Sequence, residues 1–313
     1  MDIVNELKNN SKKFNKIVIW GFRRRWHTHR FIFQAYYENL KKCGIPVVWV
    51  EDEEKSKKII EKNDLILSAS GMHGKMVPEK KSLLDYHLPI RDDVYYCLHA
   101  ENDFFIEKIN FEKSIKLKFY SNEAEQYEKI YETVHFDSVS KTLYQPWGTN
   151  LLPHEFNEPV FCKTKLVFWI GSIWKGKNKE GNISEIFKLK NILRNKNLFF
   201  IPLRFVPNSF NKFFIRHSRL APAIGGEIQV HNNYLPCRMF KNISYGQLGF
   251  SNIEKFNDIF LGCNVYDKDN SVMIDKVLSL SKEEYIDVIK KQQLICKQYT
   301  IAHHLNNIFK YLN

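Results

Sequence analysis

Residues 234–252 read YLPCRMFKNISYGQLGFSN, and this stretch predicts a short helix that runs directly into a strand. Pro236 suits the first helical turn, where its missing N–H is no loss, and Gly246 suits the exit, where a left-handed residue is often needed. The apolar run after Gly246 is typical of a strand. A helix that leads into a strand is a unit of α/β proteins, so the stretch indicates that class.

The same stretch carries cations near the predicted helix start. Arg238, Lys241 and Asn242 can reach an anion there, and a helix N-terminus adds free N–H groups and partial positive charge. Ser244 and Tyr245 lie close to the strand that follows. We interpret this helix as one that binds phosphate. An amphipathic core helix with a solvated basic edge explains the stretch, taken alone, equally well.

Short apolar runs alternate with helical patterns on both sides of this stretch. Runs such as KIVIWGF (16–22) and KLVFWIGS (165–172) predict strands, and the alternation predicts parallel, doubly wound sheets. The segment 150–164 has two prolines and no clear period, so we expect a domain boundary there. The predicted domains are 1–155 and 156–313, the second ending in a long helix from about residue 282 to residue 311.

The length and composition fit two globular domains. The chain has 313 residues, of which 44% are hydrophobic and 14% aromatic, enough for two packed cores. Its six cysteines are far apart and form no CxxC or Cys/His ligand spacing, which is typical of reduced thiols in a cytosol. No signal-peptide pattern or run of ~18–20 apolar residues is present. We expect a cytoplasmic protein, soluble or peripherally attached to a membrane.

The formal net charge of +12 favours an anionic partner, such as nucleic acid, anionic lipid headgroups or a nucleotide-linked substrate. The basic residues are spread along the whole chain. Runs such as 8–13 and 175–179 are therefore interpreted as solvated faces rather than as nucleic-acid arms.

Polar residues follow the predicted strands of the first domain. His29 lies just after the first strand, and His99 and Glu101 lie at the end of the strand predicted within 92–102. Ligands of this architecture bind at the carboxyl ends of the strands. Since a histidine titrates near neutral pH, we expect His29, His99 or Glu101 to assist an acceptor hydroxyl. A structural role for each of them stays open.

The second domain offers a glycine, a serine and arginines in comparable positions. Gly171 and Ser172 follow its first strand, and Arg204 and Arg216 belong to a basic region before the predicted phosphate helix. Cations and helix N–H groups there stabilise a diphosphate while it leaves and gains charge.

Motifs for a metal ion or a dinucleotide are absent from the sequence. HExxH, GxGxxG and GxxxxGK[ST] do not occur, and Asp267 and Asp269 are more simply a turn. We expect neither a metal ion nor a cofactor.

Taken together, these residues resemble the GT-B glycosyltransferases, in which two Rossmann-like domains face each other across a cleft. The resemblance covers nearly the whole chain in architecture and is specific at 165–172 and 231–252. It implies that the second domain holds the nucleotide-sugar donor and the first the acceptor. Many retaining members have two glutamates eight positions apart in this region, and here those places hold Asn233 and Lys241.

Two shorter resemblances add detail. A tyrosine, a cation four residues later and a glycine after the helix are similar to the donor motif of some α-1,3-fucosyltransferases, which implies that Arg238 contacts the diphosphate with Tyr234 nearby. Those enzymes have a glutamate just before the cation, where this chain has Cys237. The segment WGTNLLPHEF resembles the interdomain region of group-1-like transferases, which places Trp147 and Asn150 near the cleft.

The leading hypothesis is a metal-independent glycosyltransferase in which Arg238 and Lys241 neutralise the leaving diphosphate. Its expected partners are a nucleoside-diphosphate sugar and a hydroxyl acceptor on a glycan, lipid or protein, with no nucleic acid and with a peripheral membrane contact open. One alternative is a nucleotide-sugar epimerase of the same architecture. The other is a non-catalytic basic module that binds nucleic acid or anionic membrane, suggested by the aromatic and basic mixture at 208–219.

Overall fold

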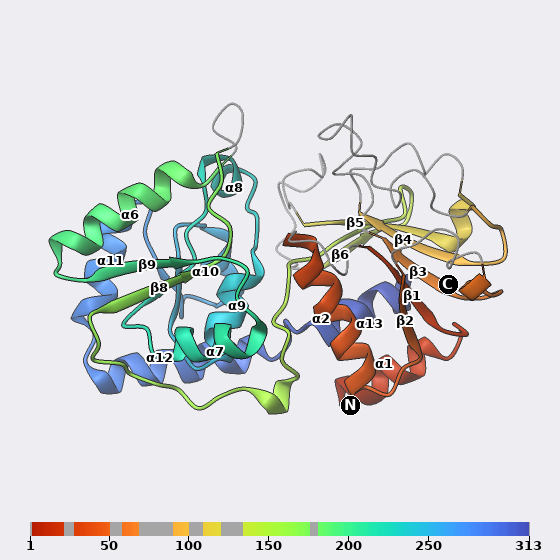
Figure 1. Cartoon of the computed structure of the whole chain (residues 1–313), viewed down its shortest axis with the longest axis horizontal. Helices are drawn as coiled ribbons and strands as arrows, with labels where there is room; N and C mark the ends of the chain where they lie inside the picture. Colours follow the sequence, from red (N-terminus) through yellow and green to blue (C-terminus); the bar gives the residue numbers. More distant parts are fainter. Residues whose placement is uncertain are drawn as a thin grey trace. The chain divides into compact units, whose positions relative to one another are not determined.

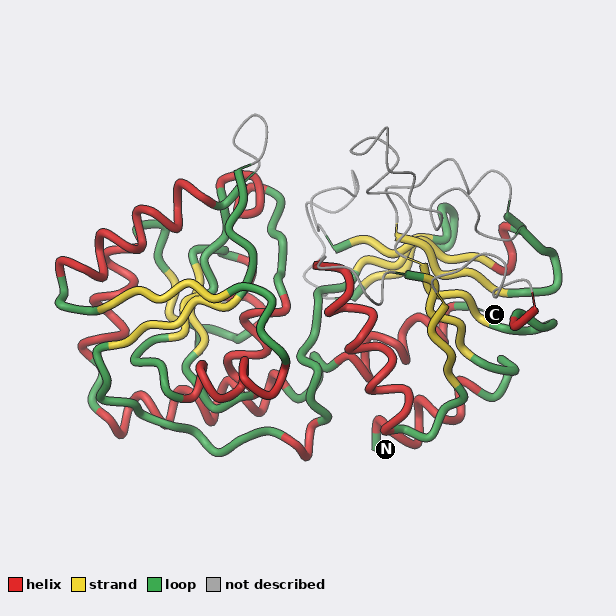
Figure 2. The backbone as a smooth tube through the Cα atoms, in the orientation of Figure 1, coloured by secondary structure: helices red, strands yellow, loops and turns green. Residues whose placement is uncertain are grey.

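A computed structural model describes residues 2–21, 28–50, 58–68, 90–99, 109–119, 134–175 and 181–312. The chain forms two compact units (Figure 1). Unit 1 comprises Met1–Lys118, Val134–Gln145 and Ile301–Asn313, and unit 2 comprises Phe119–Thr133 and Pro146–Thr300. Each unit is an α/β structure with parallel strands, as the sequence predicts (Figure 2).

Unit 1 is built on a seven-stranded sheet in the order β2-β1-β3-β4-β5-β7-β6. Every neighbouring pair is parallel except β6 and β7, which are antiparallel. The central strands β1 and β3 are buried at every position, as is usual for parallel strands covered on both faces. The strands are β1 (Ile17–Trp20), β2 (Val47–Val50), β3 (Leu65–Ser68), β4 (Tyr95–His99), β5 (Ser114–Lys118), β6 (His135–Asp137) and β7 (Thr142–Tyr144).

Unit 1 also contains the helices α1 (Ile3–Ser11), α2 (Thr28–Lys42) and α13 (Ile301–Tyr311) and the 3-10 turn η1 (Phe111–Lys113). Helix α13 is tied to both other helices. The Tyr36 hydroxyl lies 2.8 Å from Nε2 of His304, and the Asn306 amide donates to the Glu6 carboxylate at 2.8 Å. Burial raises the pKa of the Tyr36 hydroxyl well above its usual range.

The division between the units differs from the expected one. The long segment of unit 2 begins at Pro146, about ten residues before the predicted boundary, and the last helix belongs to unit 1. The reason is that the predicted C-terminal helix is two helices, which separate before Ile301. The buried apolar face of the second, α13, completes the core of unit 1; it consists of Ile301, Ala302, Leu305, Ile308 and Phe309.

The outgoing and returning segments run side by side. The Thr149 N–H donates to the Tyr299 carbonyl at 2.9 Å, and Thr149 forms a parallel bridge with Thr300. Gly148 lies against the Thr300 backbone, where a β-carbon would come within 2.7 Å of the carbonyl carbon. A glycine is therefore required at this close approach.

Unit 2 contains two groups of parallel strands. Strand β8 (Leu166–Ile170) pairs with β9 (Phe199–Leu203), and the short strands β10 (Ala221–Pro222), β11 (Gly249–Ser251) and β12 (Val265–Tyr266) form the other group. The Arg219 N–H donates to the Leu166 carbonyl at 2.7 Å, and the Ser218 hydroxyl donates to the Leu220 carbonyl and accepts from the Phe168 N–H. These bonds join the start of β10 to β8.

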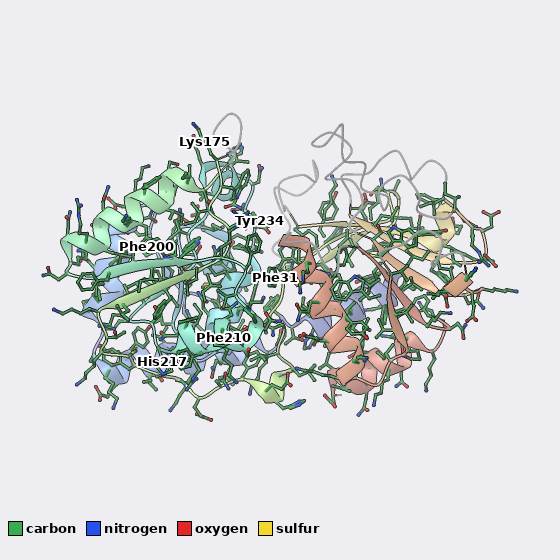
Figure 3. The ribbon with its side chains drawn as sticks, viewed as in Figure 1. Phe31, Lys175, Phe200, Phe210, His217 and Tyr234 are labelled. Atoms are coloured by element: carbon green, nitrogen blue, oxygen red, sulfur yellow. The ribbon has the colours of Figure 1, made fainter. Side chains whose placement is uncertain are left out.

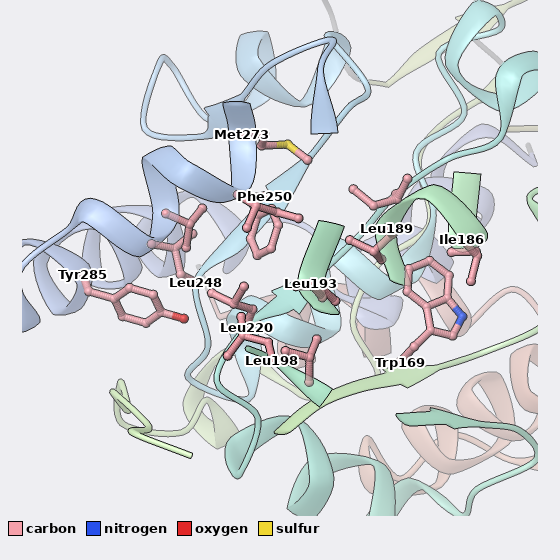
Figure 4. Close-up of a cluster of buried hydrophobic side chains, with 14 of the residues drawn as sticks. Trp169, Ile186, Leu189, Leu193, Leu198, Leu220, Leu248, Phe250, Met273 and Tyr285 are labelled. Atoms are coloured by element: carbon pink, nitrogen blue, oxygen red, sulfur yellow. The ribbon is translucent and has the colours of Figure 1, made fainter. Parts of the chain in front are cut away.

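Helices pack on both faces of β8. The Trp169 face contacts α6 (Ile183–Asn195) and α11 (Asn270–Ser279) through a buried cluster that includes Leu189, Phe250 and Met273 (Figure 4). The opposite face places Phe168 against Phe214 of α7 (Asn208–Arg216). The remaining helical segments are α8 (Glu227–His231), α9 (Cys237–Ser244), α10 (Lys255–Ile259), α12 (Lys282–Cys296) and the 3-10 turn η3 (Pro153–Glu155).

Among the described residues, no helix is both long enough and apolar enough to span a bilayer.

Candidate anion-binding site

Helix α9 forms where the sequence predicts it. Pro236 is the N-cap, the helix runs over Cys237–Ser244, and Gly246 follows its C-cap with φ of +87°. A β-carbon at Gly246 would overlap the Glu158 carbonyl oxygen, so both backbone conformation and space require glycine. The buried face of the helix, formed by Met239, Phe240 and Ile243 among others, fixes α9 against the rest of unit 2.

Arg238 reaches from the first turn of α9 to the carboxyl end of β8. Its Nε donates to the Ile170 carbonyl at 3.1 Å, and its guanidinium carbon lies 3.7 Å from the centroid of the Trp169 ring. Gly171 has φ of +145°, and its missing β-carbon leaves the space that the guanidinium occupies. The strand end, the glycine and the helix start therefore hold the cation together.

Arg238 is a partly exposed cation in an apolar setting. Burial lowers the pKa of its guanidinium to about 10, and the side chain stays protonated at neutral pH. None of the ion pairs in the described part of the chain includes Arg238, and its terminal amino groups donate no hydrogen bond to a described residue. A cation held in this way offers two parallel donors to an anionic group.

Two buried asparagines fix the loops beside Arg238. Asn182 accepts from the Trp174 N–H and donates to the Ser172 carbonyl, each at 3.1 Å. Asn252, directly after β11, accepts from the Gly225 N–H at 2.8 Å and donates to the carbonyl of the same residue at 3.2 Å. The loops after β8 and β10 are thereby held by side chains at the carboxyl edge of the strands.

Those two loops also touch each other. A β-carbon at Gly226 would lie 2.5 Å from the Gly181 carbonyl oxygen. The glycine pair at 225 and 226 thus lets the β10 loop approach the segment that leads into α6.

Five of the predicted donor residues lie at this carboxyl edge: Gly171, Ser172, Arg204, Tyr234 and Arg238. The Gly171 N–H donates to the Leu203 carbonyl at 3.1 Å, which brings the ends of β8 and β9 together and places Arg204 next to them. The Arg204 guanidinium lies 4.5 Å from the centroid of the Phe205 ring. Tyr234 lies three residues before α9, in the segment that leads to Arg238. Lys241 is one turn further along α9, on the same side as Arg238.

The other four predicted donor residues are not brought to this edge: Arg216, Asn242, Ser244 and Tyr245. A rise of 1.5 Å per residue places Tyr245 about 10 Å along the helix from Arg238. Their polar groups form hydrogen bonds within the protein. Arg216 donates to the Tyr245 and Glu158 carbonyls, and Asn242 donates to the Ala221 carbonyl. The Ser244 hydroxyl lies 2.7 Å from the Thr149 hydroxyl, and the Tyr245 hydroxyl donates to Asn150. These bonds anchor the C-terminal end of α9.

The predicted acceptor residues belong to the part of the chain before residue 102. His29 lies in the first turn of α2 and His99 ends β4, but their side chains fall outside the described part of the chain, as does Glu101. Trp147 stacks on Phe119 with the ring centroids 3.6 Å apart.

Sequence reasoning missed Trp169, Asn182 and Asn252. Asn252 follows a strand at its carboxyl end, so the rule that selected Gly171 and Ser172 applies to it as well. Trp169 gave no such signal, because a tryptophan in an apolar run is typical of a core, and it is indeed 1% exposed.

The predicted turn at residues 267–269 is confirmed. Asp267 accepts from the Asp269 N–H at 2.9 Å, and Asp269 caps α11 by accepting from the Ser271 N–H at 2.7 Å. Within the described ranges, no three His, Cys, Asp or Glu side chains gather as a metal site.

Several solved structures resemble this chain in arrangement. An apo structure of OtsA has a TM-score of 0.48 and 9% identity, and covers 91% of this chain and 78% of its own. The N-terminal domain of trehalose-6-phosphate phosphatase from Candida albicans gives 0.47 and 7%, and covers 91% and 76%. A second OtsA structure, described as trehalose-6-phosphate synthase, gives 0.47 and 9%, and covers 97% and 83%. No protein-family model and no curated protein sequence matches the chain.

Proposed function

We propose that the chain is a glycosyltransferase that binds the diphosphate of a nucleotide-sugar donor at the carboxyl edge of unit 2. The observation that carries this proposal is Arg238, a cation held over Trp169 at the N-terminus of α9 with its terminal amino groups uncommitted to the described residues. Helix N-terminal N–H groups and a guanidinium fork are complementary to phosphate oxygens.

The proposed role of Arg238 is electrostatic. In the transfer, the bond between the anomeric carbon and the diphosphate oxygen breaks, a bond to the acceptor oxygen forms, and the leaving diphosphate gains negative charge. A preorganised cation in a partly buried setting stabilises that charge more than it stabilises the bound donor. Lys241, on the same side of α9, adds a second positive charge.

The proton of the acceptor hydroxyl needs a base. We assign this role to His29, His99 or Glu101, because imidazole and carboxylate groups accept a proton near neutral pH. We assign neutralisation of the leaving group to Arg238 and Lys241 rather than to a metal ion. Turnover that is unchanged by a chelator would agree with that assignment, and restoration of lost turnover by Mg²⁺ or Mn²⁺ would reject it.

The direct test is binding of nucleoside diphosphates to the whole protein by calorimetry. UDP, GDP, ADP, CDP and dTDP are titrated into the natural protein and into Arg238→Met, which keeps an apolar stem over Trp169. We expect one base to bind and the variant to lose about tenfold or more in affinity, the scale of a charge-assisted bidentate contact. Arg194→Ala is the matched control, because Arg194 is an exposed cation at the C-terminal end of α6.

Binding of no nucleotide by the natural protein, or equal losses in both variants, would reject the proposal. An epimerase is separated from a transferase by the product: incubation of the donor sugar without any acceptor yields an isomerised donor only for the epimerase.

A further inference from the structure

Helix α7 has an aromatic surface on the side that faces away from the core. At about 100° per residue, Phe213 lies about 160° around the helix from Ile215, which is 2% exposed and packs inward. The rings of Phe213 and His217 have their centroids 4.2 Å apart, and Phe210 precedes Phe213 by three residues, which places it on the same side of the helix. Figure 3 shows the side chains of Phe210 and His217. Phe210 is 57% exposed and Phe213 53%. A surface helix usually places polar residues on its outer side, whereas α7 places phenylalanines there.

A third exposed phenylalanine lies on the side of the β8–β9 pair that carries α7. Phe199 begins β9 and is 61% exposed. It alternates with Phe200, whose ring contacts Trp169 on the α6 side, so Phe199 projects from the side that carries α7. We call Phe199, Phe210 and Phe213 the phenylalanine face.

The sequence around the phenylalanine face is basic. Residues 196–226 contain no Asp or Glu, and their cations are Lys196, Arg204, Lys212, Arg216 and Arg219. Lys212 and Arg216 follow one another at i and i+4 along one flank of the aromatic stripe. Glu158 meets Arg216 through its backbone carbonyl, and Lys196 is paired with Asp275. A helix with phenylalanines outermost and cations at their flank is typical of helices that lie in the interface of an anionic bilayer.

We propose that the phenylalanine face inserts into the headgroup region of an anionic membrane, with Lys212 against the lipid phosphates and Arg216 adding its charge beside it. The arrangement favours a bilayer over a nucleic acid, because the outermost groups are apolar rings and the cations lie at their flank. It stands independently of the sugar-transfer proposal, since Phe210, Phe213 and Lys212 are not among the residues placed around Arg238.

The test is flotation of the whole protein with vesicles. One set is phosphatidylcholine alone, and the other is an about equal mixture of phosphatidylcholine and phosphatidylglycerol. We expect binding to the anionic set, an about tenfold or greater loss of partitioning in the double variant F210S/F213S, and a partial loss in Lys212→Glu. Phe187→Ser is the matched control, because Phe187 is 59% exposed on α6, at the other face of β8. It should bind as the natural protein does.

Three results would overturn the proposal: absence of binding to anionic vesicles, equal losses in F210S/F213S and Phe187→Ser, or retained vesicle binding in F210S/F213S. A parallel titration with a single-stranded oligonucleotide separates the alternative partner. Tight oligonucleotide binding that F210S/F213S abolishes, without vesicle binding, would assign the face to nucleic acid instead. Circular dichroism of each variant shows that the exposed substitutions leave the fold intact.

Discussion

The guanidinium of Arg238 occupies the space in which a β-carbon of Gly171 would stand. Gly171 directly follows β8 and Arg238 lies in the first turn of α9, so the two elements can meet in this way only while residue 171 is glycine. The absence of a side chain at residue 171 and the hydrogen bond to the Ile170 carbonyl together fix the position of the guanidinium.

Gly171→Ala should therefore displace Arg238. We expect the free energy of unfolding to fall by about 1–3 kcal/mol from the strained φ and the overlap, and the affinity for the nucleoside diphosphate to fall about tenfold or more. Urea unfolding and calorimetric titration measure the two effects. Gly262→Ala is the control, since Gly262 also has a positive φ, of +76°, but has open space around it. Unchanged nucleotide affinity in Gly171→Ala would contradict this account of the site.

Asn252→Ala should release the loop after β10. Asn252 is 6% exposed, and its loss leaves the N–H and carbonyl of Gly225 without their partner in a buried position. We expect a loss of about 1–3 kcal/mol in the free energy of unfolding and weaker nucleotide binding. Asn195→Ala, at an exposed position on α6, should change neither quantity. If both asparagine variants are equally stable, Asn252 does not hold the loop.

His303 should make the stability of unit 1 depend on pH. Burial lowers the pKa of its imidazole to about 4 from the ordinary 6.5, although Glu6 opposes the shift. Between these two pKa values the imidazole is protonated in the unfolded chain and neutral in the folded chain. The free energy of unfolding should therefore decrease as the pH falls from about 6.5 to about 4, by about 2–3 kcal/mol. Above pH 6.5 the effect of this histidine should vanish.

Urea unfolding at a series of pH values checks this expectation. His303→Gln should flatten the acid limb of the stability profile, and the same substitution at the exposed His154 should leave it as it is. Identical profiles for the natural protein and His303→Gln would show that another group causes the acid loss.

Phe309→Ala should destabilise unit 1 and spare the anion site. Phe309 is completely buried on α13, and truncation of a core phenylalanine costs about 3–5 kcal/mol. Because α13 belongs to unit 1, we expect nucleotide binding at low temperature to persist. Leu294→Ala on α12, where Leu294 is 68% exposed, is the control. Loss of nucleotide binding together with the unit 1 transition would mean that the units do not unfold separately.

The strands were predictable because parallel strands covered on both faces appear as short apolar runs, as at Ile17–Trp20 and Leu65–Ser68. Strand β6 was missed, since its three residues are only partly buried and pair antiparallel at the edge of the sheet. Helix α1 was missed although Asp2 gives an N-cap signal, with Ile3 and Leu7 buried one turn apart. The helical period predicted one helix where the structure has α12 and α13, because the period does not show where the chain passes from one unit to the other.

The candidate site was predictable in part. The position of Arg238 followed from the helix start, because a helix N-terminus and the end of the preceding strand lie at the same edge. The positions of Arg216 and Tyr245 could not be predicted from the sequence, because sequence distance does not show which end of α9 a side chain contacts. Their mutual hydrogen bond at 2.8 Å is a tertiary contact.

The return of α13 to unit 1 has a consequence for synthesis on the ribosome. The strands of unit 1 are translated before most of unit 2, but the helix that covers them follows it. At about 5–20 residues per second, residues 146–300 take roughly 10–30 seconds to translate, and throughout that interval the surfaces of α1 and α2 that α13 covers stay open to water. Unit 1 is therefore the first unit to be translated and the last to complete its layer of helices.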